Sequence, residues 1–178
     1  MKGLQQITRA MVFAEAAHAG QVRKYTGSPY ITHPMAVAKL VADFGGDLAQ
    51  VIGALLHDTV EDVDEVTHAI IKMNFGDDVS MIVHGMTKHE YPEGTLRLVK
   101  KAAEAVRMSE CPQRVQFVKC CDIIHNCGDI IPYDVNFGKV YLDEAAVCLN
   151  RMEPSDVREY AIAIVKGEQI KVNLLLDI

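Results

Sequence analysis

The sequence contains no tryptophan, and aromatic residues make up only 6% of its 178 residues. Hydrophobic residues nevertheless reach 49%, so a sizeable core must be largely aliphatic. Such a composition favours packed helices over a β-sandwich, because strands are enriched in aromatic and β-branched residues. We therefore expect an all-α fold, a compact multi-helix bundle, and the chain length suggests a single domain.

A run of basic residues is also lacking, and the formal net charge is −6. Binding to polymeric nucleic acid depends largely on neutralising phosphates, so this class of partner is not expected. A small anionic substrate remains open, because a metal ion and a few local cations can outweigh the global charge.

No apolar run approaches the roughly 18 residues that a membrane span needs. The first 20 residues carry Arg9 and Glu15 inside an apolar helical pattern, which is typical of an amphipathic helix and not of a secretory signal. We expect a cytoplasmic protein without a membrane partner. The five cysteines include no C-x-x-C pair, so buried thiols are favoured over disulfides or a structural zinc site.

Helical spacing of apolar residues covers most of the chain, and no convincing alternating strand pattern interrupts it. Asp47 is expected to cap a nearly all-apolar helix over about residues 48–60. The end of the chain, 170–178, alternates enough to be a strand or an extended arm. The other expected helices cover about residues 4–19, from His33-Pro34 to before Phe44, 66–74, 77–87, 95–108, 112–127, 137–150 and 155–167.

Four polar residues at separated places interrupt this apolar pattern: His33, the pair His57-Asp58, and Asp122. Neighbouring helical residues diverge by about 100°, so His57 and Asp58 share an ion only if it lies between their directions. A carboxylate such as Asp122 in an apolar helix costs several kcal/mol if unpaired, and a metal ion removes that penalty. Imidazole with carboxylate suits Mn²⁺ or Fe²⁺, with Zn²⁺ or Mg²⁺ as further options. We predict one divalent ion held by these four side chains.

Two acids follow the His-Asp pair at i,i+4 spacing: Glu61 follows His57, and Asp62 follows Asp58. Carboxylates beside a metal can hold and deprotonate its water, so these two are the candidate catalytic groups.

Three polar residues are candidate nucleotide contacts. Asn126 lies four residues after Asp122 and points to the same side of its helix. Arg23 and Lys24, in the turn before His33, could stack on a purine and pair with phosphate.

Each feature also has a structural explanation. The acids after His57 could form a solvated helix end, and Asp122 could be a capped or salt-bridged core carboxylate. The joint occurrence of the four residues favours the metal site.

Several long segments carry a family resemblance. The runs are His18-Ala19-Gly20-Gln21-Val22-Arg23-Lys24, Gly27-Ser28-Pro29-Tyr30-Ile31-Thr32-His33-Pro34, Leu55-Leu56-His57-Asp58-Thr59-Val60-Glu61-Asp62 and Val118-Lys119-Cys120-Cys121-Asp122-Ile123-Ile124-His125-Asn126. Together they resemble the motifs of the RelA/SpoT-type hydrolase domains of the HD superfamily. The resemblance spans about residues 5–150, followed by a C-terminal helix and tail over 151–178.

The resemblance implies a helical HD-type hydrolase domain that binds Mn²⁺ through His33, His57, Asp58 and Asp122. It implies removal of the 3′-pyrophosphate of ppGpp or pppGpp, giving GDP or GTP and pyrophosphate. Glu61 and Asp62 become the catalytic acids, and nucleotide contacts fall to Arg23, Lys24, Asn126 and Tyr141. The chain is too short for a synthetase domain as well, so it resembles a stand-alone small alarmone hydrolase, similar to the metazoan SpoT homologue.

Ile123, Gly128 and Asp129 depart from the family pattern, which has basic residues near these positions. An HD phosphohydrolase acting on a related nucleotide, such as an adenine alarmone or the 2′-phosphate of NADPH, therefore stays open. A third hypothesis is a non-catalytic nucleotide-binding domain, whose signature would be loss of a ligand or of both acids. The sequence also leaves a homo-oligomer open.

Overall fold

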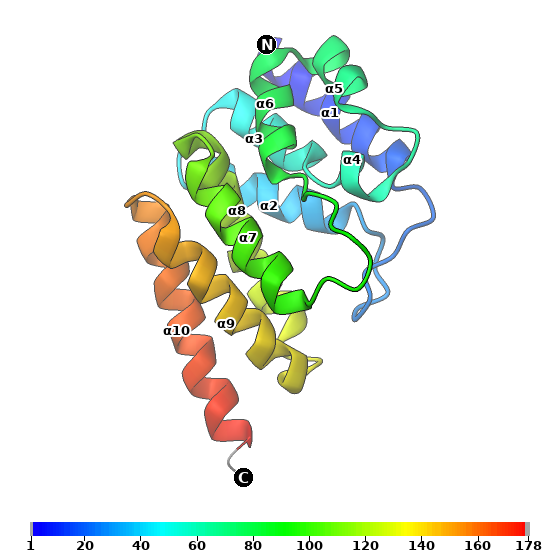
Figure 1. Cartoon of the computed structure of the whole chain (residues 1–178). Helices are drawn as coiled ribbons and strands as arrows, with labels where there is room; N and C mark the ends of the chain where they lie inside the picture. The colour runs from blue at the N-terminus through cyan, green and yellow to red at the C-terminus, as the bar shows by residue number, and fades with distance from the viewer. Residues whose placement is uncertain (1, 177–178) are drawn as a thin grey trace. The chain divides into compact units, whose positions relative to one another are not determined.

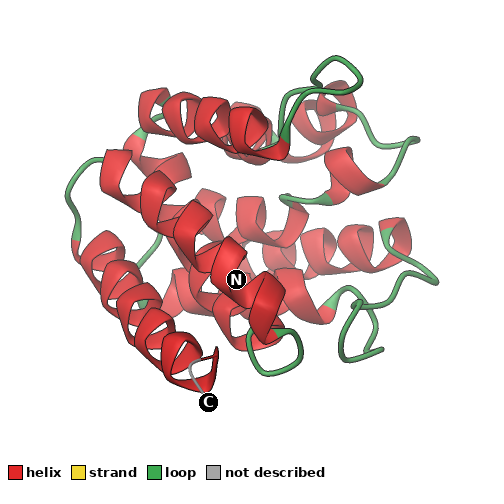
Figure 2. Cartoon of the chain, turned by 60° about the horizontal axis from the view of Figure 1, so that its bottom comes forward, coloured by secondary structure: helices red, strands yellow, loops and turns green. Residues whose placement is uncertain are grey.

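The computed structural model describes residues 2–176, and all regular secondary structure in that range is helical (Figures 1 and 2). The predicted all-α class is confirmed. The helices are α1 (Lys2–Ala17), α2 (Thr32–Asp43), α3 (Leu48–Leu56), α4 (Thr59–Asp62), α5 (His68–Phe75), α6 (Asp77–Met86), α7 (Arg97–Glu110), α8 (Gln113–Ile130), α9 (Val135–Arg151) and α10 (Asp156–Leu176).

The chain divides into two compact units, Met1–Lys88 and His89–Ile178. Helices α1 to α6 belong to the first unit, and α7 to α10 belong to the second. The expected single domain over 1–178 stays a prediction. Between residues 2 and 176, no helix combines the length and the apolar character that crossing a bilayer requires.

Helix α3 is the core of the first unit and packs against α1, α2 and α6. Asp47 caps it as predicted: its carboxylate accepts the backbone N–H of Gln50, whose side chain in turn accepts the N–H of Asp47. Leu55 and Leu56, at the end of α3, are 2% and 0% exposed. This buried helix therefore delivers the following residues, His57 and Asp58, to a fixed place.

The helix expected over 48–60 is interrupted after Leu56, and α4 begins at Thr59. The hydroxyl of buried Thr59 donates to the carbonyl oxygen of Leu56 over 2.7 Å, a local side-chain bond that competes with regular helix geometry. Asp58 has φ −95° and ψ −9°, between the two helices. The sequence pattern predicted the helical character correctly but not this turn, where His57 and Asp58 lie.

Close packing between α3 and α6 depends on Gly53. A Cβ atom added at this glycine would lie 2.5 Å from Cγ2 and 2.9 Å from Cβ of Ile82, which is fully buried. We expect Gly53→Ala to lower the free energy of unfolding by about 1–3 kcal/mol, because overpacking outweighs the gain in helix propensity. Denaturant titration measures this change.

Gly167→Ala is the matched control for that substitution. Gly167 also lies within a helix, α10, but a Cβ there meets nothing within 4 Å. This substitution should raise the free energy of unfolding by up to about 1 kcal/mol. Equal effects of the two substitutions would contradict the close α3–α6 contact.

In the second unit, α9 packs against α7, α8 and α10. Three of the cysteines on α8, Cys120, Cys121 and Cys127, are buried, and burial raises the pKa of each thiol to about 12. These thiols stay protonated at neutral pH and serve as small apolar core residues, as predicted.

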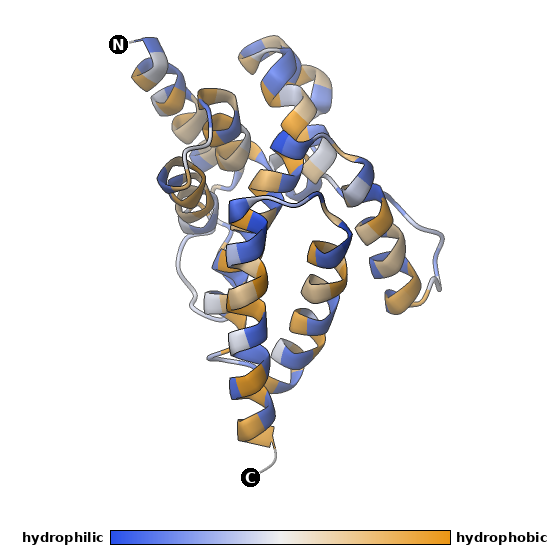
Figure 3. Cartoon of the chain, turned by 90° about the vertical axis from the view of Figure 1, so that its left-hand side faces the viewer, coloured by the Kyte–Doolittle hydropathy of each residue, from blue (hydrophilic) through white to orange (hydrophobic). Residues whose placement is uncertain are grey.

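The last helix extends well beyond the predicted end near residue 167 and continues to Leu176. Val157, Ala161, Val165 and Val172 are its buried residues, at helical and not strand spacing. The apparent alternation after Ile170 therefore does not form a strand, and Figure 3 shows the last turn of α10 as hydrophobic. Asp177 and Ile178 lie outside the described residues.

Candidate metal centre

His33 lies in the first turn of α2 and is 2% exposed. Its backbone N–H donates to the carbonyl oxygen of Tyr30, which closes the turn that leads into the helix. Pro34 follows at a position where a missing N–H costs least, as the sequence suggested. The turn therefore fixes the imidazole of His33 at the start of a rigid element.

His57 directly follows α3 and is also 2% exposed. Its Nδ1 lies 2.8 Å from the backbone carbonyl oxygen of Ala54, which can only accept, so Nδ1 carries a proton and donates. In the neutral ring, Nε2 then presents a lone pair. This is how proteins commonly fix the tautomer of a metal-binding histidine.

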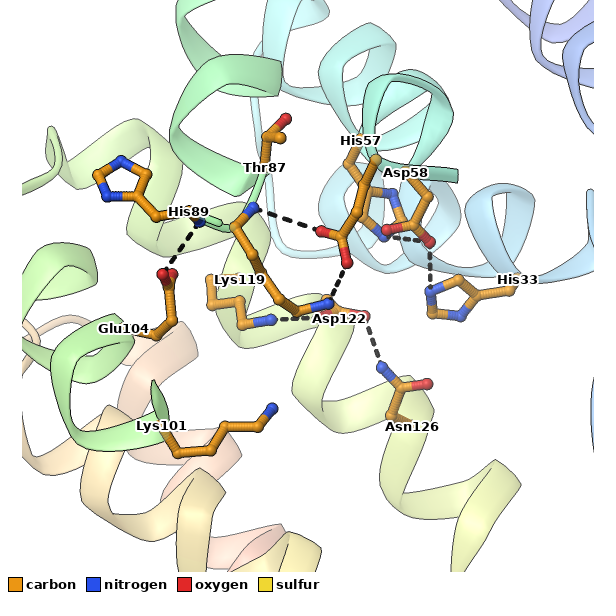
Figure 4. Close-up of polar contacts among 12 residues, drawn as sticks. His33, His57, Asp58, Thr87, His89, Lys101, Glu104, Lys119, Asp122 and Asn126 are labelled. Carbon is orange, nitrogen blue, oxygen red and sulfur yellow. Dashed lines mark hydrogen bonds and ion pairs between the residues drawn. The ribbon is translucent and has the colours of Figure 1, made fainter. Parts of the chain in front are cut away.

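The Asp58 carboxylate lies between the two imidazoles (Figure 4). Its Oδ2 is 3.1 Å from Nε2 of His57 and 3.6 Å from Nε2 of His33. One ligand atom from each of the three residues lies within 4.8 Å of the others. A carboxylate oxygen facing an imidazole lone pair is repulsive unless a cation lies between them, so this donor set fits a divalent metal ion.

Tyr30 also contacts Asp58, and sequence reasoning missed this contact. Its hydroxyl donates to Oδ2 of Asp58 over 2.8 Å. Burial, then the nearby charges of Asp58 and Asp62, raise the pKa of Tyr30 far above its usual value, so the hydroxyl remains a donor. Tyr30 belongs to a recognisable turn motif, but no local pattern links it to a residue 28 positions away.

The two candidate catalytic acids lie on α4 with different partners. Glu61 forms an ion pair with the side chain of Lys88, and its Oε2 accepts the backbone N–H of Lys88 over 3.3 Å. Asp62 interacts with Tyr30, and burial, together with the charge of Asp58, raises its pKa. Both acids are therefore in the first unit, within a few residues of Asp58.

The loop before α2 carries the candidate substrate cations. The guanidinium of Arg23 lies 5.5 Å from the ring centroid of Tyr30, and the ammonium of Lys24 lies 4.7 Å from that of Tyr25. Arg23 N donates to Ser28 O over 2.8 Å, which narrows the loop. Arg23 is thus brought to the same tyrosine that contacts Asp58.

In the second unit, Asp122 lies on α8 and is 5% exposed. Its Oδ2 accepts Nζ of Lys119 over 2.7 Å, and its Oδ1 accepts Nδ2 of Asn126 over 2.6 Å (Figure 4). Burial raises the pKa of Tyr141 well above its usual value, with Asp122 as a further cause and a hydrogen bond from Asn126 opposing it. The predicted residues Asp122, Asn126 and Tyr141 are therefore brought together.

The structure thus gathers His33, His57 and Asp58 in one unit and places Asp122 among polar partners in the other. The complete ligand set, the catalytic acids and the nucleotide contacts stay predictions. Of the site residues, Lys119 was also missed, although its i,i+3 spacing to Asp122 is a readable signal.

Taken together, the fold and the His-His-Asp cluster define an all-helical protein with a candidate divalent-metal centre. The family model described as HD domain matches residues 10–128, so the chain belongs to the HD domain family. The resemblance to RelA/SpoT-type members of this family is confirmed by the relatives that follow.

A probable GTP pyrophosphokinase of Mycobacterium leprae is 40% identical over 131 residues, covering 69% of this chain and 16% of the relative. The guanosine-3′,5′-bis(diphosphate) 3′-pyrophosphohydrolase MESH1 of Xenopus tropicalis is 37% identical over 128 residues, covering 70% of this chain and 69% of MESH1. The chain spans only 14–16% of the length of the first three curated relatives.

Among solved structures, a metazoan ortholog of SpoT that hydrolyzes ppGpp has a TM-score of 0.80 at 20% identity. The match covers 92% of this chain and 95% of that one. The Listeria monocytogenes protein lmo0812 has a TM-score of 0.63 at 23% identity, covering 81% of this chain and 99% of that one. At these identities the likeness establishes the fold.

Proposed function

We propose that this protein is a metal-dependent phosphohydrolase that removes the 3′-pyrophosphate of ppGpp or pppGpp, giving GDP or GTP and pyrophosphate. The observation that carries the proposal is the cluster of buried His33, buried His57 and half-buried Asp58, in which the Ala54 carbonyl fixes Nε2 of His57 as a lone-pair donor. The name of MESH1, a relative of comparable extent, supports the choice of substrate.

His33, His57 and Asp58 would hold the ion, with Asp122 proposed as the fourth ligand. The mixture of imidazole and carboxylate ligands favours Mn²⁺ over metals that prefer thiolate ligands. When bound, the ion supplies a water of lowered pKa and offsets negative charge on the phosphates.

The chain's own groups would carry the rest of the reaction. Glu61 or Asp62 accepts a proton from the attacking water, whose oxygen forms a bond to the phosphorus next to the 3′ oxygen. The bond from that phosphorus to the 3′ oxygen breaks, and the 3′ oxygen leaves and takes up a proton. Arg23 and Lys24 would bind the nucleotide, because an arginine stacks on a purine and a lysine pairs with phosphate. Asn126 and Tyr141 are the proposed contacts from the second unit.

A second candidate is a related nucleotide substrate, such as an adenine alarmone or the 2′-phosphate of NADPH. Ile123 is 3% exposed and contributes no cation, and Asp129 adds a negative charge beside His125, 3.9 Å away. These positions would weaken recognition of a highly charged guanosine nucleotide. We propose a cytoplasmic location for either activity.

The deciding experiment incubates the purified protein with ppGpp, pppGpp, the adenine analogue and NADPH, each with and without Mn²⁺. We expect Mn²⁺-dependent release of pyrophosphate from ppGpp, its loss on chelation and its return when Mn²⁺ is added back. His57→Ala should abolish the activity, and His84→Ala, which changes an exposed histidine on α6, should not. Faster turnover of another nucleotide would favour the second candidate, and no turnover of any nucleotide would refute both.

A further inference from the structure

We propose that Tyr30 is a positioning residue that holds the Asp58 carboxylate in its metal-binding orientation and links it to the loop that carries Arg23. The inference rests on the proposed function in one respect, namely that Asp58 binds a metal ion. It concerns how the chain orients the Asp58 carboxylate and not which nucleotide is hydrolysed.

The first observation is that backbone hydrogen bonds fix Tyr30 on both sides, to the start of its loop and to the first turn of α2. Tyr30 N donates to Gln21 O over 3.0 Å, and the carbonyl oxygen of Tyr30 accepts the N–H of His33 over 3.0 Å. Val22 and Pro29 form an isolated antiparallel bridge between the two arms of the loop. Tyr30 is therefore tied to the loop on one side and to the candidate ligand His33 on the other.

The second observation is the packing of the Tyr30 ring. The ring of buried His18 lies 4.7 Å away, the ring of His33 lies 6.1 Å away, and the Arg23 guanidinium lies 5.5 Å from the Tyr30 ring centroid. A ring with neighbours of this kind has little freedom to rotate, so its hydroxyl is held in place. The cation–π contact also makes the position of Arg23 depend on the same ring.

The third observation is the atom that the hydroxyl contacts. Tyr30 donates to Oδ2 of Asp58, the same oxygen that lies 3.1 Å from Nε2 of His57. The donor occupies one lone-pair direction of Oδ2 and restricts rotation of the carboxylate, so another lone pair can face the imidazoles. Hydrogen bonds of this kind to metal ligands typically account for 10- to 100-fold in metal affinity.

A parallel contact ties the other end of the same turn to the loop. Gln21 donates from Nε2 to the backbone oxygen of Asp62 over 3.1 Å, while its Oε1 accepts Nδ1–H of His18 over 2.8 Å. The loop therefore contacts Asp58 through the Tyr30 hydroxyl. It contacts Asp62 through the Gln21 side chain as well as through Tyr30. Removal of the Tyr30 hydroxyl should leave the Gln21 contact, and with it the fold of the turn, intact.

Tyr30→Phe is the direct test, because phenylalanine keeps the ring and removes only the hydroxyl. Titration of the metal-free protein with Mn²⁺, followed by electron paramagnetic resonance of the free ion, should give a Kd about 10- to 100-fold above that of the wild type. At saturating Mn²⁺ the KM for ppGpp should change little, because Arg23 still packs on a ring.

Tyr25→Phe is the matched control. It removes a hydroxyl from the same loop, one that accepts a hydrogen bond from Nζ of Lys24. Its Kd for Mn²⁺ should equal that of the wild type. Thermal unfolding without metal reports any loss of fold separately.

An unchanged Kd for Mn²⁺ in Tyr30→Phe would overturn the positioning role, even if its melting temperature falls and the wild type hydrolyses ppGpp. A weakened Kd in a protein whose wild type does not release pyrophosphate from ppGpp would support the positioning role and refute the proposed substrate. If the wild type binds no Mn²⁺, both inferences fail.

Discussion

Glu61→Gln and Asp62→Asn are each expected to bind Mn²⁺ as the wild type does and to hydrolyse ppGpp about 10²- to 10⁴-fold more slowly. Both substitutions keep the size of the side chain and remove its ability to accept a proton. Because neither residue is a proposed ligand, the loss should fall on kcat and not on metal affinity. Single-turnover release of pyrophosphate and Mn²⁺ titration on the same samples measure the two quantities.

The contacts of the two acids allow their roles to be separated. Glu61 pairs with Lys88, whereas Asp62 interacts with Tyr30. The charge of Asp58 also contributes to the raised pKa of Asp62. Lys88→Met removes the partner of Glu61 and leaves both acids in place. If Glu61 is the proton acceptor, this variant should lower kcat at unchanged Mn²⁺ affinity, because the ion pair that orients the Glu61 carboxylate is lost.

Glu65→Gln provides the control, since Glu65 is an exposed acid only a few residues beyond α4. Its activity and metal affinity should match the wild type. Full turnover in both Glu61→Gln and Asp62→Asn would show that neither acid is the base. Weakened Mn²⁺ binding in Glu61→Gln would instead place Glu61 among the ligands.

Sequence reasoning reached the main elements of the first unit because their signals are local. The cap at Asp47 and the polar pair His57-Asp58 after an apolar helix are both visible within a few residues of sequence. His33 was predicted because it is a polar residue at the start of an apolar helix. Their meeting in space was inferred from their joint occurrence, and the cluster of the three residues agrees with it.

What sequence reasoning missed is non-local or depends on a single side chain. The bond from Tyr30 to Asp58 spans 28 positions, and the contact of Glu61 with Lys88 spans 27, so neither has a periodic signature. The break after Leu56 coincides with a hydrogen bond from the Thr59 hydroxyl to Leu56 O, and a threonine hydroxyl can equally well point to solvent in another context. The predicted end of α10 was wrong because alternation of apolar and polar residues over a short segment is weak evidence for a strand. The single buried residue of this segment, Val172, is equally compatible with a helix.

Asp122 has the surroundings both of a core carboxylate and of a metal ligand. Its carboxylate is nearly buried and accepts hydrogen bonds from Lys119 and Asn126 on the same helix. A core carboxylate paired with a lysine would show the same bonds, and so would a metal ligand oriented by its neighbours. The predicted role as fourth ligand therefore needs a measurement that responds to the metal and not only to stability.

We expect Asp122→Asn to weaken Mn²⁺ binding by about 100-fold or more and to abolish Mn²⁺-dependent pyrophosphate release, because a neutral amide is a poor ligand for a hard cation. The same variant should lose about 1–3 kcal/mol of unfolding free energy, because the bond to the Lys119 ammonium is lost. Asp129→Asn, a change of the same chemistry one helical turn beyond Asn126, should leave the Mn²⁺ affinity unchanged.

The double variant Lys119→Met, Asp122→Asn separates the two roles of Asp122. Removal of both members of the pair should restore part of the lost stability, because the half-buried Lys119 ammonium is then no longer left without its partner. If Asp122 is a ligand, Mn²⁺ binding should stay as weak in the double variant as in Asp122→Asn, since stability alone does not supply a donor atom. Recovery of Mn²⁺ affinity together with stability would show that Asp122 acts only through the fold, and the metal would then be held by His33, His57 and Asp58 without it.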